Sequence, residues 1–101
     1  MTTEITKENG LATVALIGRL DTPSTPEAEA ALFPLMQDET VKDILIDCSQ
    51  LTYISSSGLR IFITLQKHYI KTGGKLTLSS LTPAVQTVFD MTGFTSIFTI
   101  A

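Results

Sequence analysis

Residues 43–62, with the sequence DILIDCSQLTYISSSGLRIF, place three consecutive serines between two apolar runs. The first run, Ile44–Ile46, is continuous and has β-branched residues at both ends, which is typical of a central strand covered on both faces. The second run belongs to residues 58–71, whose apolar positions recur with helical spacing. The serine triplet, residues 55–57, is therefore expected where a buried strand leads into a helix, and we call it the serine corner.

The helix after the serine corner is expected to be largely buried, with one exposed polar stripe. The stripe has spacings of 4, 3 and 4 residues, which place its members on one side of a helix; they are Arg60, Thr64, Lys67 and Lys71. The opposite side is apolar and is formed by Leu59, Phe62, Ile63 and Ile70. Gly73 and Gly74 are expected to end this helix.

The other segments alternate strand and helix patterns around this corner. Asn9-Gly10 favours a hairpin turn between two strand-like stretches. The next helix has Thr25 as its expected N-cap and Pro34 as a kink or a break. A half-buried strand at 75–81, a short helix with its cap at Thr82 and a last strand at 96–100 complete the chain. The order β-β-α-β-α-β-α-β predicts an α/β fold in which an opening β-hairpin and then parallel crossovers build a mixed sheet flanked by helices.

Composition limits the classes of function. The 101 residues fit a single domain, 1–101, and the 44% hydrophobic content is enough for a core. The net charge is −3 and Lys and Arg do not cluster, so no nucleic-acid partner is expected. No apolar run reaches the ~18 residues of a membrane span, so no membrane insertion is expected. Cys48 is the single cysteine and the first residues do not resemble a secretory signal, which together indicate a cytoplasmic protein.

Nothing in the sequence supports catalysis by this chain. A serine nucleophile needs a base within hydrogen-bond reach, and the single histidine, His68, lies about 12 residues or roughly 18 Å along the helix from Ser56. No group of His, Cys and carboxylate residues has the spacing of a metal site, and the TGGK stretch lacks the spacing of a phosphate-binding loop. We therefore expect no enzyme activity, no metal and no cofactor.

Two interpretations of the serine corner remain open at this point. In the simpler one, Ser56 or Ser57 only caps the helix by accepting a hydrogen bond from its first turn. In the other, the corner is a functional site, because it lies at the carboxyl end of a buried strand, where α/β proteins commonly bind ligands. Gly58 favours the second interpretation, since a residue without a side chain lets another backbone approach closely.

Three stretches in order resemble one protein family. IDCSQLTYISSSGLRIF, residues 46–62, is similar to the signature of STAS domains, the anti-sigma-factor antagonists. The matching positions are Asp47, Ser49, Leu51, Tyr53, Ile54, Ser56, Ser57, Gly58 and Leu59. GRLDT at 18–22 resembles an earlier loop of the family, and residues 73–100 resemble its ending, so the resemblance covers nearly the whole chain.

The resemblance implies a phosphorylation switch. A partner that is both anti-sigma factor and serine kinase would phosphorylate Ser56, the unphosphorylated antagonist would bind that partner, and a serine phosphatase would reset it. The family usually has Asp directly before the acceptor serine, where this chain has Ser55, so Ser55 and Ser57 compete with Ser56 as acceptors. The implied partner-binding residues are Asp21, Ser55, Ser56, Ser57, Gly58, Arg60 and Thr64. Some family members are instead constitutive subunits of lipid-transport ATPase complexes or of other signalling assemblies, and that is the alternative function.

Overall fold

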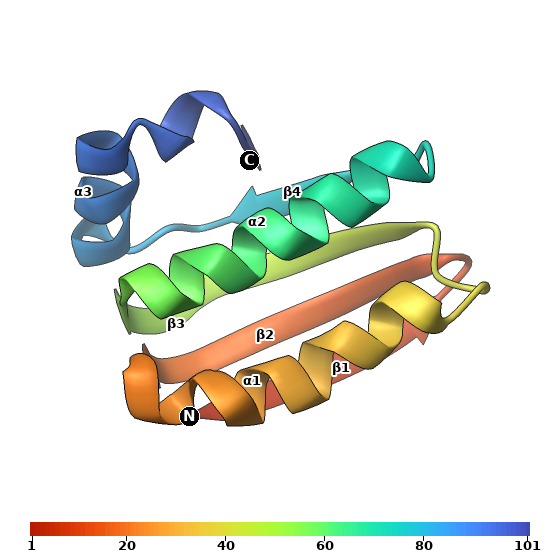
Figure 1. Cartoon of the computed structure of the whole chain (residues 1–101), viewed down its shortest axis with the longest axis horizontal. Coiled ribbons are helices and arrows are strands. Elements are labelled where there is room, and N and C mark those ends of the chain that lie inside the picture. Colours follow the sequence, from red (N-terminus) through yellow and green to blue (C-terminus); the bar gives the residue numbers. More distant parts are fainter.

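The computed structural model describes all residues 1–101 and contains one five-stranded sheet in the order β1-β2-β3-β4-β5 (Figure 1). The strands are β1 (Thr2–Glu8), β2 (Leu11–Leu20), β3 (Asp43–Ile54), β4 (Leu76–Ser79) and β5 (Thr99–Ile100). β1 pairs antiparallel with β2, and every other neighbouring pair is parallel. The predicted mixed sheet is therefore confirmed. Asn9 and Gly10 form the hairpin turn with positive φ angles of 51° and 83°, the geometry that the Asn-Gly pair favours.

Three α-helices and three short 3₁₀ segments connect the strands. The α-helices are α1 (Thr25–Leu32), α2 (Ser56–Lys71) and α3 (Pro83–Thr92), and the 3₁₀ segments are η1 (Thr22–Ser24), η2 (Phe33–Gln37) and η3 (Phe94–Ser96). The element order matches the prediction. Pro34 lies inside η2, so α1 ends two residues before it and the predicted break is confirmed. The last strand is shorter than predicted, because η3 and its C-cap Ile97 occupy much of the segment before Thr99.

The sheet is covered by helices on one face. Along β3, Ile44 and Ile46 are buried and Leu45 between them is only partly buried, and β2 alternates in the same way. In Figure 1, α1 and α2 lie in front of the sheet, and their apolar sides pack on its buried face. The prediction of a β3 covered on both faces is therefore wrong. A short apolar run cannot tell a doubly covered strand from a strand whose second face is apolar and half exposed.

α2 presents its exposed polar stripe as predicted, and Leu59 and Phe62 on its other side are buried. Ile70 is the exception, because 65% of its surface is exposed. It lies seven residues, or about two turns, after the partly buried Ile63, on the border between the buried and the exposed sides of the helix. The core positions of the last turns are taken instead by Gln66 and Tyr69.

Candidate functional site

The serine corner connects β3 to α2, as predicted, and Ser55 is the residue that caps the helix. Its backbone is extended (φ −91°, ψ 172°) and its Oγ accepts a hydrogen bond of 3.2 Å from the backbone N–H of Gly58. The Ser55 N–H donates to the carbonyl of Leu20 at 2.9 Å, which fixes the corner to the end of β2. The expectation that Ser56 or Ser57 serves as the cap is therefore wrong. Ser and Asp are both strong N-cap residues, so Ser55 fills the capping role that an Asp would fill at this position.

Ser56 and Ser57 occupy the first turn of α2, and their side chains differ in environment. Ser56 is exposed and its hydroxyl has no hydrogen-bond partner in the protein, whereas Ser57 is partly buried and lines a groove between α1 and α2. The two differ because successive residues of a helix are turned by about 100°. The first backbone N–H groups of a helix have no partner within it, so the hydroxyl of Ser56 lies beside unsatisfied donors and the positive end of the helix dipole.

Gly58 is buried and packs inward. A Cβ at this position would lie 2.7 Å from Cγ of Leu20 and 2.9 Å from Cγ1 of Ile54, both of which are core side chains. The glycine therefore allows α2 to pack closely against the ends of β2 and β3. The expectation that Gly58 opens the corner to an approaching backbone is corrected, since the space beside it is already filled.

The groove beside the serine corner has a volume of about 240 Å³ and brings together several predicted residues. It is lined by Thr25, Glu29, Phe33, Ser57, Arg60, Ile61 and Thr64. The hydroxyl of Thr64 donates to the carbonyl of Arg60 at 2.9 Å. The guanidinium of Arg60 is exposed and forms no salt bridge within the chain. It is thus a free cation one helical turn from both Ser56 and Ser57.

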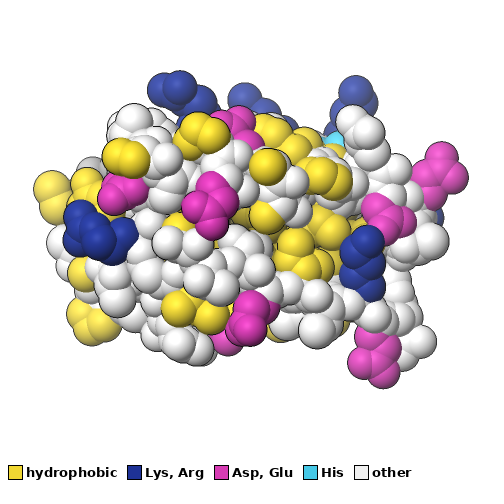
Figure 2. Space-filling model, turned by 90° about the horizontal axis from the view of Figure 1, so that it is seen from below, with side chains coloured by type: hydrophobic (Ala, Val, Ile, Leu, Met, Phe, Trp, Pro, Cys, Tyr) yellow, Lys and Arg dark blue, Asp and Glu magenta, His cyan; other side chains and the backbone are white.

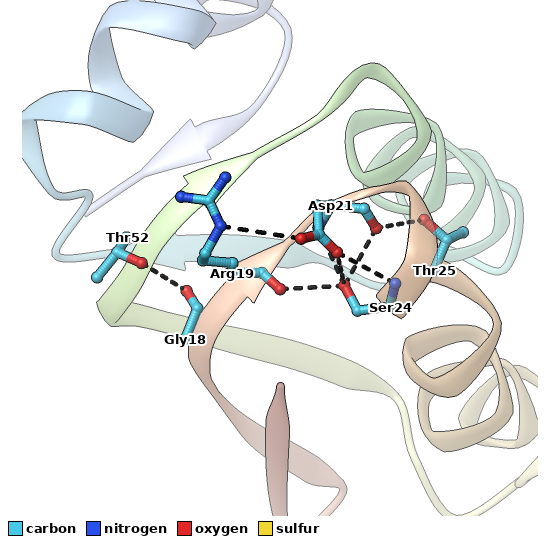
Figure 3. A network of polar contacts seen from close by, with 6 residues as sticks. All are labelled: Gly18, Arg19, Asp21, Ser24, Thr25 and Thr52. Carbon is cyan, nitrogen blue, oxygen red and sulfur yellow. Dashed lines mark hydrogen bonds and ion pairs between the residues drawn. The ribbon is translucent and has the colours of Figure 1, made fainter.

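Asp21 lies in a hydrogen-bonded turn at the end of β2 (Figure 3). Its carboxylate accepts from the backbone N–H of Ser24 at 3.2 Å and from the Ser24 hydroxyl at 2.9 Å, while the Asp21 N–H donates to Ser24 Oγ at 3.0 Å. The hydrogen bond from the Ser24 hydroxyl is the main reason why the pKa of Asp21 is lowered, so the carboxylate is ionised at neutral pH. The spacing Asp-x-x-Ser is that of a capping box, a signal that the sequence contained. The predicted cap, Thr25, instead donates its hydroxyl to the carbonyl of Asp21 at 3.0 Å.

The turn at Asp21 and the serine corner belong to one polar edge of the sheet. The carboxyl ends of β2 and β3 are neighbours, and Thr52 Oγ1 donates to the Gly18 carbonyl at 3.0 Å across them (Figure 3). Arg19 lies 3.8 Å from the Asp21 carboxylate, and its guanidinium lies 4.3 Å from the ring centroid of Tyr53. The sequence analysis missed the contact between Arg19 and Tyr53, because this contact depends on the register between two strands.

The residues with possible chemical reactivity lie away from this edge. His68 lines a different cavity, formed with residues such as Met36, Asp38 and Gly74 near the far end of α2. Cys48 is fully buried, and burial raises the pKa of its thiol to about 12, so it is not a thiolate nucleophile. None of the three α-helices has the length and the apolar composition needed to cross a membrane. At this edge the structure presents the exposed hydroxyl of Ser56 beside a groove between α1 and α2.

Known proteins resemble this chain over nearly its whole length. A family model described as the STAS domain matches residues 2–101. BtrV of Bordetella bronchiseptica, a candidate anti-sigma factor antagonist, is 34% identical over 95 residues, which cover 94% of this chain and 81% of that protein. The anti-sigma-B factor antagonist of Staphylococcus aureus is 29% identical over 90 residues, which cover 89% of this chain and 82% of that protein.

Solved structures show the same fold. The unphosphorylated form of the anti-sigma factor antagonist SpoIIAA superposes with a TM-score of 0.84 at 19% identity, over 99% of this chain and 88% of that chain. The phosphorylated form of SpoIIAA, a cell fate determinant of Bacillus, superposes with a TM-score of 0.77 at 18% identity, over 99% and 91% of the two chains. The resemblance seen in the sequence is confirmed: the chain belongs to the STAS domain family, and it is a non-enzymatic binding protein.

Proposed function

We propose that the chain is a cytoplasmic anti-sigma factor antagonist whose binding is switched by phosphorylation of Ser56. The unphosphorylated form binds an anti-sigma factor that is also a serine kinase, and so frees a sigma factor. Phosphorylation of Ser56 by that kinase ends the binding, and a serine phosphatase restores it. The names of the relatives BtrV and the anti-sigma-B factor antagonist, and the two solved forms of SpoIIAA, support this proposal.

The observation that carries the proposal is the division of roles between Ser55 and Ser56. Ser55 is partly buried and its hydroxyl is occupied by the cap to Gly58, whereas the Ser56 hydroxyl is exposed and unpartnered on the first turn of α2. A kinase has to reach the hydroxyl, so Ser56 is the most accessible acceptor of the three. Ser57 is less favourable, because it is partly buried in the groove against α1.

The proposed partner surface surrounds this acceptor. It consists of Asp21, Ser55, Ser56, Ser57, Arg60 and Thr64, with Gly58 packing beneath it. Phosphorylation changes the net charge from −3 to about −4.5 or −5. Within the domain the phosphate sits at a helix N-terminus, where the dipole favours it by roughly 0.3–1 kcal/mol. The new charge therefore acts outward, on the partner, and leaves the fold intact.

The test is phosphorylation of the purified chain. The chain is incubated with the co-purified anti-sigma factor and ATP, and the phosphorylated residue is mapped by mass spectrometry. We expect phosphate on Ser56, loss of phosphorylation in Ser56→Ala, and normal phosphorylation in the control Ser49→Ala, another exposed serine that lies on β3. Phosphate mainly on Ser55 or Ser57 would place the acceptor elsewhere in the corner.

The alternative function rests on Ser55, which stands where the family usually has an Asp next to the acceptor. Under that alternative the chain is a constitutive STAS subunit of a lipid-transport ATPase complex or another signalling assembly. Affinity purification separates the two functions. Recovery of membrane ATPase subunits with an unmodified serine corner favours the subunit, and recovery of an anti-sigma factor with phosphate on the corner favours the switch.

A further inference from the structure

Five residues of α2 form an outward stripe that starts at the serine corner. They follow one another at spacings of 4, 3, 4 and 3 residues, the repeat with which one helix packs along another; they are Ser56, Arg60, Ile63, Lys67 and Ile70. Ile63 is partly buried and the other four are exposed. We call this set the α2 seam. No other element covers α2 on the outer side of the helical layer (Figure 1).

The apolar members of the α2 seam are unusual for a solvated helix face. Ile63 and Ile70 are seven residues apart, so they recur at the same position of successive repeats, and Ile70 is 65% exposed. Between them, the Gln66 side chain donates to the carbonyl of Ile97 at 3.0 Å, and Ile97 is itself 53% exposed. A second exposed isoleucine, Ile97, therefore belongs to the segment that borders the seam. Ile63 packs partly against the core, so the exposed apolar surface along this side of α2 comes from Ile70, from Ile97 and from the exposed part of Ile63. Exposed apolar surface rimmed by polar residues is typical of protein contact sites.

The charged members of the α2 seam lack partners within the chain. α2 contains Arg60, Lys67 and Lys71 and no Asp or Glu, although the whole chain has a net charge of −3. The salt bridges of the protein use Lys7 and Arg19 instead. Figure 2 shows Lys and Arg side chains projecting from its upper rim, the side on which Figure 1 places the helices. A basic stripe on an acidic protein attracts an acidic partner surface.

We propose that the α2 seam is the docking site for a helix of the anti-sigma factor that carries an apolar stripe flanked by carboxylates. This inference rests on the proposed function and adds the chemistry of the partner. The apolar stripe would cover Ile63 and Ile70, and the carboxylates would pair with Arg60 and Lys67. A phosphate on Ser56 stands four residues before Arg60, where it competes with the partner's carboxylate for that guanidinium and repels the carboxylate.

Two other occupants fit the α2 seam less well. In a dimer of this chain, Arg60 and Lys67 of one copy would face Arg60 and Lys67 of the other copy, and repulsion between like charges disfavours this arrangement. A nucleic acid would pair with the cations, but it would leave Ile63 and Ile70 without an apolar partner. Light scattering of the chain alone and a titration with a mixed-sequence DNA duplex complete the test. Dimerisation that is lost in Ile70→Ser, or duplex binding that is lost in Lys67→Glu, would overturn the proposed occupant.

The main test measures the dissociation constant of the full chain with the purified anti-sigma factor by calorimetry. Ile70→Ser should raise it about tenfold, the scale of a moderate interface anchor. The matched control is Met91→Ser, which removes an 81% exposed apolar side chain from α3, outside the α2 seam, and should change the constant less than about twofold. Both positions are exposed, and melting curves check that both variants stay folded.

A charge reversal tests the polar half of the seam. Lys67→Glu should weaken binding about tenfold at low salt and less at high salt. The control is Lys75→Glu, which reverses an exposed cation directly before β4 and should have little effect. Chemical cross-linking to Lys67 identifies the carboxylate of the anti-sigma factor that lies beside it. Replacing that acidic residue by Lys should restore the affinity for the Lys67→Glu variant. If the anti-sigma factor binds Ile70→Ser and Lys67→Glu as tightly as wild type, the α2 seam is overturned and the proposed function stands. If the wild-type chain binds no anti-sigma factor, both are overturned.

Discussion

The two ends of the parallel strands differ in how far their polar groups satisfy one another. At the amino end, Lys7 pairs with Asp38 at 2.6 Å, Asp38 also accepts from the Thr40 hydroxyl, and Asp43 accepts from the N–H of Lys75 at 2.9 Å. At the carboxyl end, Asp21 is equally well bonded, but the hydroxyl of Ser56 and the guanidinium beside it are free. The carboxyl end therefore leaves one exposed hydroxyl and one cation without partners inside the domain.

The comparison also separates the serine corner from a larger cavity at the other end of the strands. A cavity of about 460 Å³ lies at the amino end and is lined by Met36, Asp38, Glu39, Val41, Lys42, Asp43, His68, Thr72, Gly73 and Gly74. The groove beside the serine corner has about half that volume. Cavity size alone would not have selected the groove beside the serine corner, but a binding site for a protein partner does not have to be a deep pocket.

The largest effect that we expect is on folding, at the amino end. In Gly74→Ala the new Cβ would overlap the backbone carbonyl oxygen of Lys42, which cannot move without displacing the start of β3. The free energy of unfolding should fall by about 3 kcal/mol or more, the upper range for an overpacked position. Denaturant titration measures it. The comparison variant is Gly58→Ala at the carboxyl end, where the clash is with the side chains of Leu20 and Ile54, and a loss of about 1–3 kcal/mol is expected. Equal losses of unfolding free energy in the two variants would show that the side chains of Leu20 and Ile54 move aside no more easily than the backbone of Lys42.

The second effect is on binding, at the carboxyl end. If a phosphate on Ser56 meets a partner carboxylate at about 5 Å with an effective dielectric near 20, the repulsion is roughly 3 kcal/mol per unit charge, or about a hundredfold in affinity. Ser56→Ala should therefore bind the anti-sigma factor constitutively, and Ser56→Asp should bind it weakly. Both should melt close to the wild-type temperature, because the Ser56 hydroxyl has no partner in the fold. Affinity and melting temperature are measured on the same preparations. Weak binding by an unfolded Ser56→Asp would refute the electrostatic explanation.

The third effect is on stability and concerns Ser55, the residue before Ser56 in the serine corner. Ser55→Ala removes the oxygen that accepts from the Gly58 N–H and should cost about 1 kcal/mol, or about 4–8 °C in melting temperature. Ser55→Asp keeps an N-cap acceptor and should melt close to wild type. Ser56→Ala is the matched control with no cap to lose. A Ser55→Ala variant as stable as Ser56→Ala would show that the cap contributes nothing.

Much of the fold was predictable from local patterns. Asn9-Gly10 specified a turn geometry, and Pro34 broke α1 by removing a backbone donor, so both were confirmed. The serine that caps α2 was not predictable, because the choice between Ser55 and its neighbours depends on a helix boundary, and sequence patterns leave boundaries uncertain by one or two residues.

The surroundings of single side chains were harder to predict. Leu45 is only partly buried, because its side chain lies on the second face of the sheet and no helix crosses that face. Which face the helices cover is a property of the whole topology. Arg19 reaches Tyr53 because of the strand register, in which these two residues are paired. The place of the serine corner, at the carboxyl end of β3, followed from the sequence, whereas the free hydroxyl of Ser56 was visible only in the structure.

The smallest effect concerns acid stability and returns to the amino end. The hydrogen bond from Lys7, followed by those from Thr40, lowers the pKa of Asp38 to about 2. A carboxyl with a lowered pKa stabilises the fold above its unfolded value of about 3.8, and this contribution is lost as the pH falls towards about 2. Asp38→Asn should therefore show a shallower loss of stability between about pH 4 and about pH 2 than wild type. The Asp38 side chain is partly exposed to solvent, so added salt should reduce the difference. Urea titrations at several pH values measure it, with Glu39→Gln, the exposed neighbour, as the control. Identical slopes for wild type and Asp38→Asn would show that the short Lys7–Asp38 contact contributes nothing to stability in solution.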